Sequence, residues 1–354
     1  MASYPDSAAC VPMRSVGPLK IVGPELEEEV FLPLATYETP LWASVRRGAR
    51  AFSSAGGLYV AVLREGMTRS IVCEAEHAED LRQLAGHLSE YHSKMEAVVA
   101  QTGHFVRLQG VHHEIVGSLL FLRFEMTTGD AAGHNMVTKA ADAMLSWLLE
   151  AFPFLRYVSV SGNICTDKKV SAINGLLGRG KSVVAEATLP FSVCEKILKT
   201  TPKKIVDINV KKNFVGSILA GSVRSANAHF ANMLLAIYLS TGQDCANIVE
   251  GSQGITYVEQ RGSDLYFSIT LPSIVVGTVG NGKDLPFVQE NLKVLGCLPR
   301  PDIPGQSARR LAAIVAGSVA CGELSLLAAQ TNPGELVKTH LRLERASHVQ
   351  RTSL

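Results

Sequence analysis

Two lysines and an aspartate stand together directly after an apolar segment. Residues 157–162 are expected to form a strand, and Asp167, Lys168 and Lys169 follow it in a polar loop. A lysine held in a partly desolvated cleft is a compact cation that can stabilise an oxyanion developing on a carbonyl group. A solvated charged turn explains the same spacing, because surface clusters of this composition are common.

Three further residues could move protons. Glu38 stands alone in an apolar stretch, residues 35–44, that we expect to be buried, and desolvation favours the acid form that a proton donor needs. The alternative is a carboxylate at a helix start. Asp244 lies just past Gly242, where it can be an N-cap or a buried proton-relay carboxylate. His340 lies on a late helix and by itself would be interpreted as an exposed histidine.

The segment TTGDAAGHN (127–135) follows an expected strand and opens an expected helix. Small residues and free backbone N–H groups at such a place can cradle a pyrophosphate. The spacing is not GxGxxG, and no acidic residue follows about 20 positions later, so an ordinary Rossmann site is disfavoured. The alternative role for Asp130 is a helix N-cap after a turn.

Residues 225–240 form an expected helix with Ser225 as its N-cap. Asn227, His229 and Asn232 stand on it among apolar residues, and buried polar groups need hydrogen-bond partners. We interpret His229 as a satisfied core histidine rather than a ligand.

The elements that must position these residues form an α+β fold. We expect a large helix-rich domain, residues 1–70 and 160–354, with a small α+β domain, residues 71–159, inserted into it. The elements expected from periodicity and turn residues are an extended stretch at 58–72, a helix at 77–100, strands within 105–124, helices at 135–151 and 308–329, a strand at 182–189, and a last helix from Gly334.

Composition narrows the functional class. The chain has 354 residues, 47% of them hydrophobic, which favours an oligomer interface, and a net charge of +2 without a basic stripe, which disfavours nucleic acid as a partner. No signal peptide or membrane span is expected, because the apolar run 311–322 is broken by Glu323 and reads as a buried helix. Seven cysteines without CxxC pairs indicate free thiols in the cytoplasm, and no metal-binding motif is present.

Together these segments resemble the catalytic region of 3-hydroxy-3-methylglutaryl-CoA (HMG-CoA) reductases, from about Val11 to Arg345, in a short, soluble, prokaryotic-type form with class I-like motifs. The stretches that carry the resemblance are PLATYETPLWASVRRGA, GMTRS, TTGDAAGHNM, SGNICTDKKVSAINGLLGRGKSVV, NVKKNFVGS, SANAHFANM, TGQDCANIVEGSQG, LPSIVVGTVGNG and GELSLLAAQ. The run DKK, AIN and GRGKSV is highly specific, whereas GDAAGHN is a variant of the family's GDAMGMN.

The resemblance implies a role for each matching residue. Lys168 matches the lysine that stabilises the oxyanion, and Glu38 matches the acid that protonates the reduced carbonyl. Asp244 matches the aspartate between them, and His340 matches the histidine that protonates the departing CoA thiolate. The implied substrate-binding residues are Ser44, Arg47, Arg69, Ser161, Asp167, Lys169, Lys212 and Asn232, and the implied cofactor-binding residues are His104, Phe105, Asp130, Gly133, Asn135, Thr138, Gly280 and Arg345.

The resemblance also implies an activity: two hydride transfers that convert HMG-CoA to mevalonate and release CoA, in isoprenoid biosynthesis. The inserted domain is expected to be ferredoxin-like, and the active sites are expected between subunits of a homodimer or homotetramer. NADPH is the favoured cofactor, and NADH stays possible because His104 replaces a family arginine that holds the 2′-phosphate. No metal is expected. The alternatives are NAD-dependent mevalonate oxidation in the reverse, catabolic direction and a non-catalytic acyl-CoA-binding protein.

Overall fold

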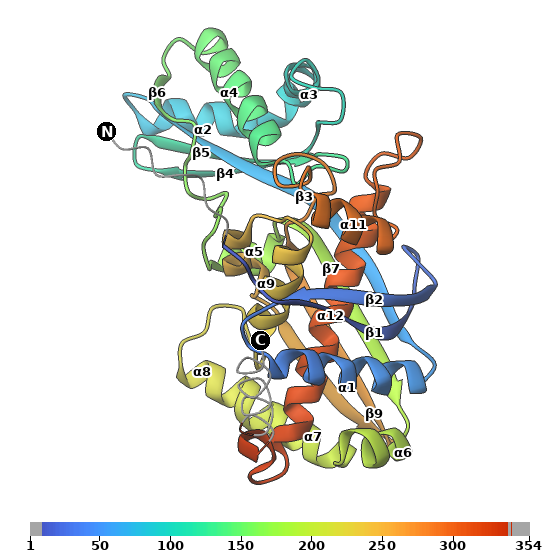
Figure 1. The fold of residues 1–354 in the computed structure, drawn as a ribbon. Coiled ribbons are helices and arrows are strands. Elements are labelled where there is room, and N and C mark those ends of the chain that lie inside the picture. The colour runs from blue at the N-terminus through green and yellow to red at the C-terminus, as the bar shows by residue number, and fades with distance from the viewer. Residues whose placement is uncertain (1–8, 339–340, 342–354) are drawn as a thin grey trace, which may run out of the picture.

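The computed structural model describes residues 9–338 and Leu341, and its strands join into one hydrogen-bonded sheet that links two bodies (Figure 1). The larger, lower body contains strands in the order β2 (Glu28–Ala35), β1 (Met13–Val22), β3 (Leu58–Glu74), β7 (Gly180–Leu189), β9 (Asp264–Ile274) and β8 (Ile255–Arg261). The smaller, upper body adds β4 (Arg107–Val116), β5 (Leu119–Thr127) and β6 (Arg156–Ser159).

Strand β3 belongs to both bodies. Its first half pairs antiparallel with β7, from Tyr59 opposite Glu186 to Gly66 opposite Gly180. Its second half pairs antiparallel with β5, from Met67 opposite Met126 to Glu74 opposite Leu119. The apolar residues that alternate along this strand therefore contribute to two separate hydrophobic cores.

Helices cover the sheet in each body. The upper body holds α2 (Ala78–His87), α3 (His92–Ala100) and α4 (His134–Ala151). The lower body holds α1 (Pro40–Ser54), α5 (Ala172–Leu177), α6 (Phe191–Val193), α7 (Pro202–Ile208), α8 (Ser217–Leu219), α9 (Phe230–Ser240), α10 (Ile248–Gly251), α11 (Pro286–Val294) and α12 (Gln306–Gln330). Short 3-10 or π turns at 88–91, 194–198, 209–216 and 245–247 adjoin several of these helices.

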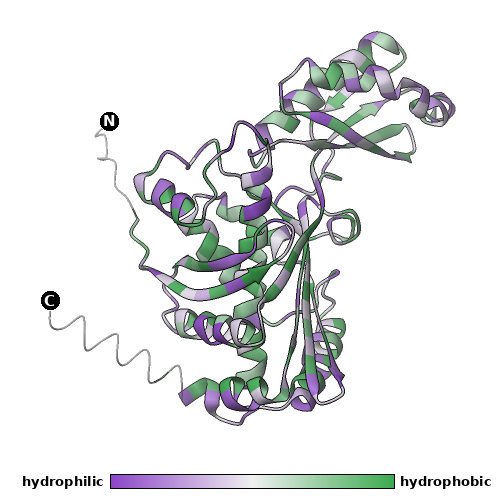
Figure 2. Cartoon of the chain, turned by 90° about the vertical axis from the view of Figure 1, so that its right-hand side faces the viewer, coloured by the Kyte–Doolittle hydropathy of each residue, from purple (hydrophilic) through white to green (hydrophobic). Residues whose placement is uncertain are grey.

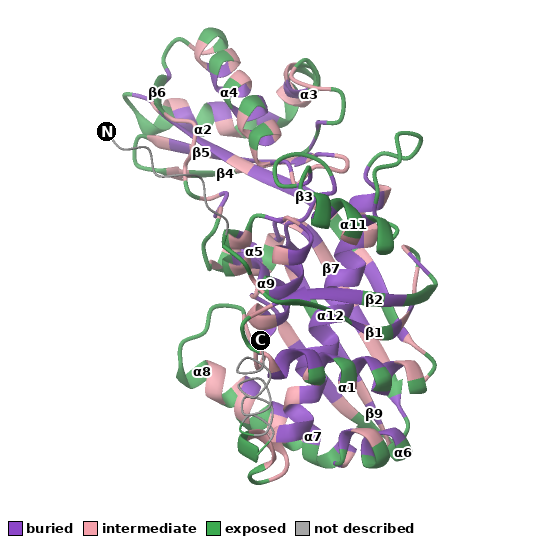
Figure 3. Ribbon diagram, in the orientation of Figure 1, coloured by how far each residue is buried: buried purple, intermediate pink, exposed green. Residues whose placement is uncertain are grey.

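Helix α12 is the centre of the lower core. It is long and apolar enough to span a membrane by length and composition alone, but 94% of its apolar window is buried among other elements. Figure 3 colours most of α12 as buried. Helix α1 lies directly against it, since a Cβ atom on Gly48 would come 2.0 Å from the Cys321 carbonyl oxygen. Figure 2 shows hydrophobic segments gathered where the elements of this body meet. We conclude that α12 is a core helix.

The structure corrects several expected elements. The helix expected over 77–100 is interrupted at 88–91. The helix expected from Ser225 begins only at Phe230, because the Ala226 N–H and C=O bond to Gly254 and Thr256 and hold the chain extended there. The second half is also less helical than expected, since β8 and β9 cross the lower body.

Candidate active site

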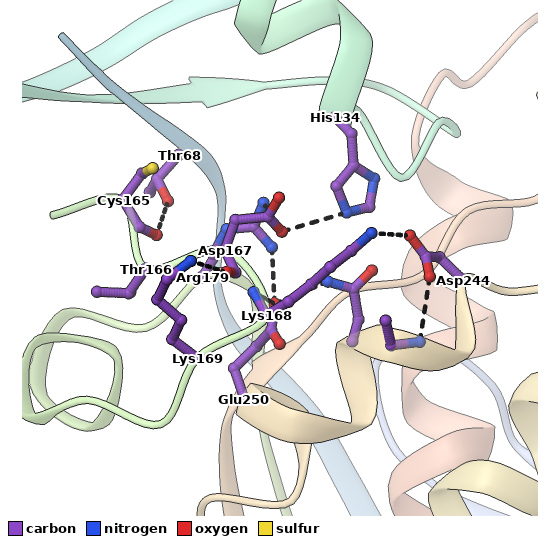
Figure 4. Close-up of polar contacts among 12 residues, drawn as sticks. Thr68, His134, Cys165, Thr166, Asp167, Lys168, Lys169, Arg179, Asp244 and Glu250 are labelled. Atoms are coloured by element: carbon purple, nitrogen blue, oxygen red, sulfur yellow. Dashed lines mark hydrogen bonds and ion pairs between the residues drawn. The ribbon is translucent and has the colours of Figure 1, made fainter. Parts of the chain in front are cut away.

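Lys168 lies in the loop after β6 and meets Asp244 from a distant part of the chain. Its Nζ is 2.7 Å from the Asp244 carboxylate, as Figure 4 shows. Asp244 is the N-cap of the 3-10 turn Cys245–Asn247, where its other oxygen accepts the Ala246 N–H at 3.1 Å. Lys168 has a positive φ of 56°, which only a well-held loop imposes on a lysine. Asp244 is therefore an N-cap, one of its two expected roles, and the expectation that it is buried is wrong, since its side chain is 42% exposed.

The Lys168–Asp244 pair stays ionised around neutral pH. The hydrogen bond that Lys168 donates to the Asp244 carboxylate raises the pKa of Lys168 and outweighs the opposing effect of burial. Burial would raise the pKa of Asp244, but the hydrogen bonds from Lys168 and the Ala246 N–H more than reverse this and lower it. Both side chains are about 40% exposed, 40% for Lys168 and 42% for Asp244, so the ammonium group can be reached by a substrate.

A buried ion cluster holds the loop beneath Lys168. Glu250 accepts the Lys168 backbone N–H at 3.2 Å and pairs with Arg179 at 2.8 Å, and neither side chain is exposed by more than 1%. Arg179 also reaches Asp167 at 3.0 Å. Sequence reasoning missed Arg179 and Glu250 as functional residues, although Arg179 stands in the GRGKSV motif.

This side of the site opens into a cavity of about 710 Å³. It brings together eight of the expected residues, which are Arg69, Gly133, Asn135, Thr138, Asp167, Lys168, Asp244 and Gly280. His134 and Lys283 also line it, and neither was expected. The His134 ring points toward Asp167, with its Nε2 3.8 Å from the carboxylate (Figure 4). Burial and the nearby Arg179 lower the pKa of His134.

Glu38 lies in a second cavity, of about 480 Å³, with Ser44, Arg47, His229 and Asn232. The expectation that Glu38 is buried is wrong for the single chain, because the residue is exposed where β2 turns into α1. Asn232 donates to the Glu38 carboxylate at 3.0 Å and lies 3.3 Å from His229 Nδ1. His229 Nε2 lies 3.0 Å from the Gly322 carbonyl oxygen. His229 is therefore satisfied by hydrogen bonds as expected, yet it also faces a cavity.

The backbone around His229 is fixed by a buried carboxylate on α12. Glu323 is fully buried and accepts the N–H groups of Ala228 at 2.7 Å and His229 at 3.1 Å. Lys212 lies nearby, half-buried, and burial lowers its pKa although the charge of Glu323 opposes this. Glu323 thus fixes the backbone just before α9, the helix that carries Asn232.

Ser44 and Arg47 lie one turn apart on α1 and contact the end of α12 and the segment after it. The Ser44 hydroxyl donates to the Ser325 hydroxyl at 3.0 Å. Arg47 donates to the Ser325 hydroxyl at 3.0 Å and pairs with Glu335 at 2.7 Å. The Arg47 cation thus sits at the wall of the second cavity.

Other expected residues lie outside both cavities. Asp130 caps α12, because its carboxylate accepts the N–H groups of Gly305 at 3.0 Å and Ala308 at 2.9 Å. His104 and Phe105 are exposed on the loop before β4. Ser161, Lys169 and Lys212 are not among the cavity-lining residues. His340 and Arg345 lie outside the described residues.

The larger cavity fits a nicotinamide dinucleotide. Helix α4 is 18 residues long and points its N-terminal N–H groups at the cavity wall formed by Gly133 and Asn135. Gly280 has a φ of 97° and open space where a Cβ atom would stand, which allows close approach of a ligand to the backbone. Among residues 9–338 and Leu341, no three His, Cys, Asp or Glu side chains are grouped to bind a metal ion.

Comparisons with known proteins identify the family of the chain. The family model described as hydroxymethylglutaryl-coenzyme A reductase matches residues 7–345. The chain is 47% identical to the 3-hydroxy-3-methylglutaryl-coenzyme A reductase of Pyrococcus horikoshii, over 90% of this chain and 78% of that one. It is 44% identical to the Aeropyrum pernix reductase, over 96% of this chain and 81% of that one.

The fold also matches solved structures. The class II HMG-CoA reductase from Streptococcus pneumoniae, bound to NADPH in open conformations, superposes with a TM-score of 0.74 at 19% identity and covers 92% of this chain and 86% of that one. None of these relatives favours the reverse, catabolic direction. From the family match and the identity over most of its length, the chain belongs to the hydroxymethylglutaryl-coenzyme A reductase family.

Proposed function

We propose that this chain reduces the HMG-CoA thioester to mevalonate with NADPH, at active sites that are shared between two copies of the chain. The family makes it an oxidoreductase of the mevalonate pathway that acts on HMG-CoA and releases CoA. The cofactor preference, the oligomer and the residue roles are the proposed parts. These parts of the proposal rest on one observation: the expected residues line two separate cavities.

Each cavity contains part of the set of residues that the proposed reduction needs. The larger has the oxyanion-stabilising Lys168 with Asp244 and the expected cofactor-binding residues, whereas the smaller has the proton donor Glu38 with Asn232. A reduction that needs both Lys168 and Glu38 at one carbonyl is supported best by a second copy that brings its smaller cavity against the larger one. We therefore propose a homodimer or a larger homo-oligomer.

Within such a site the chain's own residues divide the work. Lys168 places a fixed positive charge beside the carbonyl oxygen, and Asp244 keeps that ammonium oriented. Glu38, held by Asn232, supplies a proton to the reduced oxygen. The bound dinucleotide supplies hydride. Gly133, Asn135, Thr138 and Gly280 would hold it. His340 is proposed to protonate the thiolate.

The inserted unit is proposed to be a ferredoxin-like domain of residues 71–159 that carries the dinucleotide. Its own hydrophobic core supports this boundary, since that core draws mainly on residues 67–155.

NADPH is favoured although His104 replaces an arginine, because Arg107 and Lys139 add positive charge at the same exposed loop. The Lys139 Nζ donates to the Thr102 carbonyl at 2.9 Å, and Arg107 donates to the Val106 carbonyl at 2.7 Å. Seven free cysteines support a cytoplasmic location.

Activity is tested directly with purified protein. HMG-CoA should cause oxidation of NADPH, measured by its absorbance, with mevalonate and CoA as products. NADH should support a slower reaction. If neither reduced cofactor were consumed in the presence of HMG-CoA, the proposed activity would be wrong.

Subunit mixing tests the shared site. Glu38→Gln and Lys168→Met chains should each be nearly inactive. When they are unfolded and refolded together in equal amounts, half the dimers are mixed, and each mixed dimer has one intact site and one doubly defective site. About one quarter of the wild-type activity should return. A site built within one chain would give no recovery.

A further inference from the structure

Lys283 is a buried lysine beside the active-site cavity that has no role in the chemistry above. It follows the turn Gly280-Asn281-Gly282 in the segment between β9 and α11. Lys283 is only 5% exposed, and it lines the larger cavity together with Lys168 and Asp244. The turn is held from both ends, since Lys283 N–H bonds to the Gly280 carbonyl at 3.1 Å and Gln289 Nε2 donates to the Lys283 carbonyl at 2.6 Å.

This ammonium group lacks a counter-charge in the free chain. Its Nζ donates to the Gly242 carbonyl oxygen, and across the described part of the chain no carboxylate lies within 4.0 Å of it. An ammonium has three N–H donors, so hydrogen-bonding capacity remains. Burial lowers the pKa of Lys283 to about 8. An isolated buried charge is unfavourable unless an anion compensates it.

A second anion-binding feature adjoins the same turn. The segment before Lys283 is joined to the segment before α4, because Thr278 N–H bonds to the Asp130 carbonyl at 2.7 Å and Ala131 bridges to Val279. The N-terminus of α4, with Gly133 and Asn135, lines the same cavity as Lys283. The glycine turn, the lysine and the start of a long helix are the parts from which proteins build phosphate sites.

We infer that Lys283 is a ligand for the diphosphate of the bound dinucleotide, acting together with the backbone N–H groups at the start of α4. This inference rests on the proposed function, since it assigns the dinucleotide to the larger cavity. The ligand class is a nicotinamide dinucleotide, recognised through its anionic phosphate oxygens. The diphosphate of CoA is the competing source, and the measurements below separate the two.

The pH dependence of binding distinguishes Lys283 from its charged neighbours. The other charged or titratable groups that line the cavity are Arg69, His134, Asp167, Lys168 and Asp244. Burial lowers the pKa of His134 from 6.5, whereas the pKa of Lys168 is raised by Asp244, so both change charge outside the range around pH 8. Cys245 lies close to Lys283, and burial raises its pKa from 9.0. Affinity for a phosphate ligand should therefore fall as the pH rises through about 8, where Lys283 loses its proton.

The experiment measures dissociation constants for NADPH and for HMG-CoA, by fluorescence and calorimetry, in the full-length chain and its variants. Lys283→Met should weaken NADPH binding roughly 10- to 100-fold, the range for a lost charged hydrogen bond, and leave HMG-CoA binding unchanged. Lys283→Arg should bind NADPH tightly and should lose the decline above pH 8. The matched control is Lys293→Met on α11, an exposed lysine whose removal should leave both constants at wild-type values.

Inorganic pyrophosphate serves as the second probe, because it reports on the anion site without the nicotinamide. It should compete with NADPH on the wild-type protein and lose most of that ability on Lys283→Met. Folded Lys283→Met that binds NADPH within about twofold of wild type, or that loses HMG-CoA affinity instead, would overturn the inference. If Lys283→Met fails to fold, the test uses Lys283→Arg instead. An equal pH dependence of NADPH affinity in Lys283→Arg and the wild type would overturn the inference. Pyrophosphate binding that depends on Lys283 without any dinucleotide binding would contradict the proposed function and leave the anion site established.

Discussion

The buried pair under the catalytic loop gives the sharpest stability prediction. Glu250 is fully buried, and its Oε1 accepts bonds from Arg179 at 2.8 Å, Asn247 at 2.7 Å and the Lys168 N–H at 3.2 Å. Glu250→Gln keeps the shape and an oxygen acceptor but removes the negative charge. Of the carboxylates between residues 9 and 338, Arg179, which is 1% exposed, would then retain Asp167 alone, at 3.0 Å. Removing one partner of a buried ion pair costs about 3–5 kcal/mol of unfolding free energy. Because Asp167 still compensates part of the charge, we expect about 3 kcal/mol, the lower end of that range.

The assay is urea denaturation at neutral pH, followed by circular dichroism, with the free energy of unfolding obtained by linear extrapolation. Glu259→Gln is the matched control, because Glu259 pairs with Arg261 at the surface of β8 and its loss should leave the unfolding curve unchanged. The turnover number of Glu250→Gln should also fall, since the backbone of Lys168 is held less firmly. Equal unfolding free energies for Glu250→Gln and the wild type would refute the reasoning that the pair anchors this loop.

Two further predictions concern charge at the ends of the site. Asp244→Asn should move the alkaline limb of the kcat/KM profile to lower pH. In the wild type, the hydrogen bond that Lys168 donates to the Asp244 carboxylate raises the pKa of Lys168 and keeps the ammonium form at higher pH. An unmoved limb would exclude Lys168 as the group that titrates. His104→Arg should raise the ratio of kcat/KM for NADPH to that for NADH by roughly tenfold, as a bidentate cation replaces an imidazole, and an unchanged ratio would place the 2′-phosphate elsewhere.

Local patterns predicted much of the fold. The expected helix at 135–151 is α4 at His134–Ala151, and the expected buried helix at 308–329 is α12 at Gln306–Gln330. Both have strong apolar periodicity and clear turn residues at their ends. The Asp244 N-cap was also predictable, because the preference for aspartate at a helix start is a local property.

Features set by distant contacts could not be predicted in this way. The local pattern predicts a helix at residues 225–229, but the backbone hydrogen bonds of Ala226 to Gly254 and Thr256 hold this segment extended. Glu38 stands in an apolar stretch that predicts burial, yet its side chain lies at a cavity edge, bonded to Asn232 from another element. Glu250 and Arg179 form an ion pair although 71 positions separate them in the sequence. Their residue types alone do not indicate that they pair.

The sharing of β3 by both bodies has a mechanical consequence. Hydrogen bonds to β7 fix the strand up to Gly66, and hydrogen bonds to β5 fix it from Met67 onward. Between Val62 and Arg64 the pairing with β7 shifts register, so the ladder is interrupted there. The irregularity lies inside the β7 ladder, because Arg64, Glu65 and Gly66 still pair with β7 beyond it, and β3 changes its partner strand only between Gly66 and Met67. The segment just before α4 is tied to the lower body as well, by the bonds of Asp130 to Gly305 and Ala308 and by the bridge of Ala131 to Val279. A displacement of Gly133 and Asn135 relative to Lys168 would therefore load this second connection together with β3.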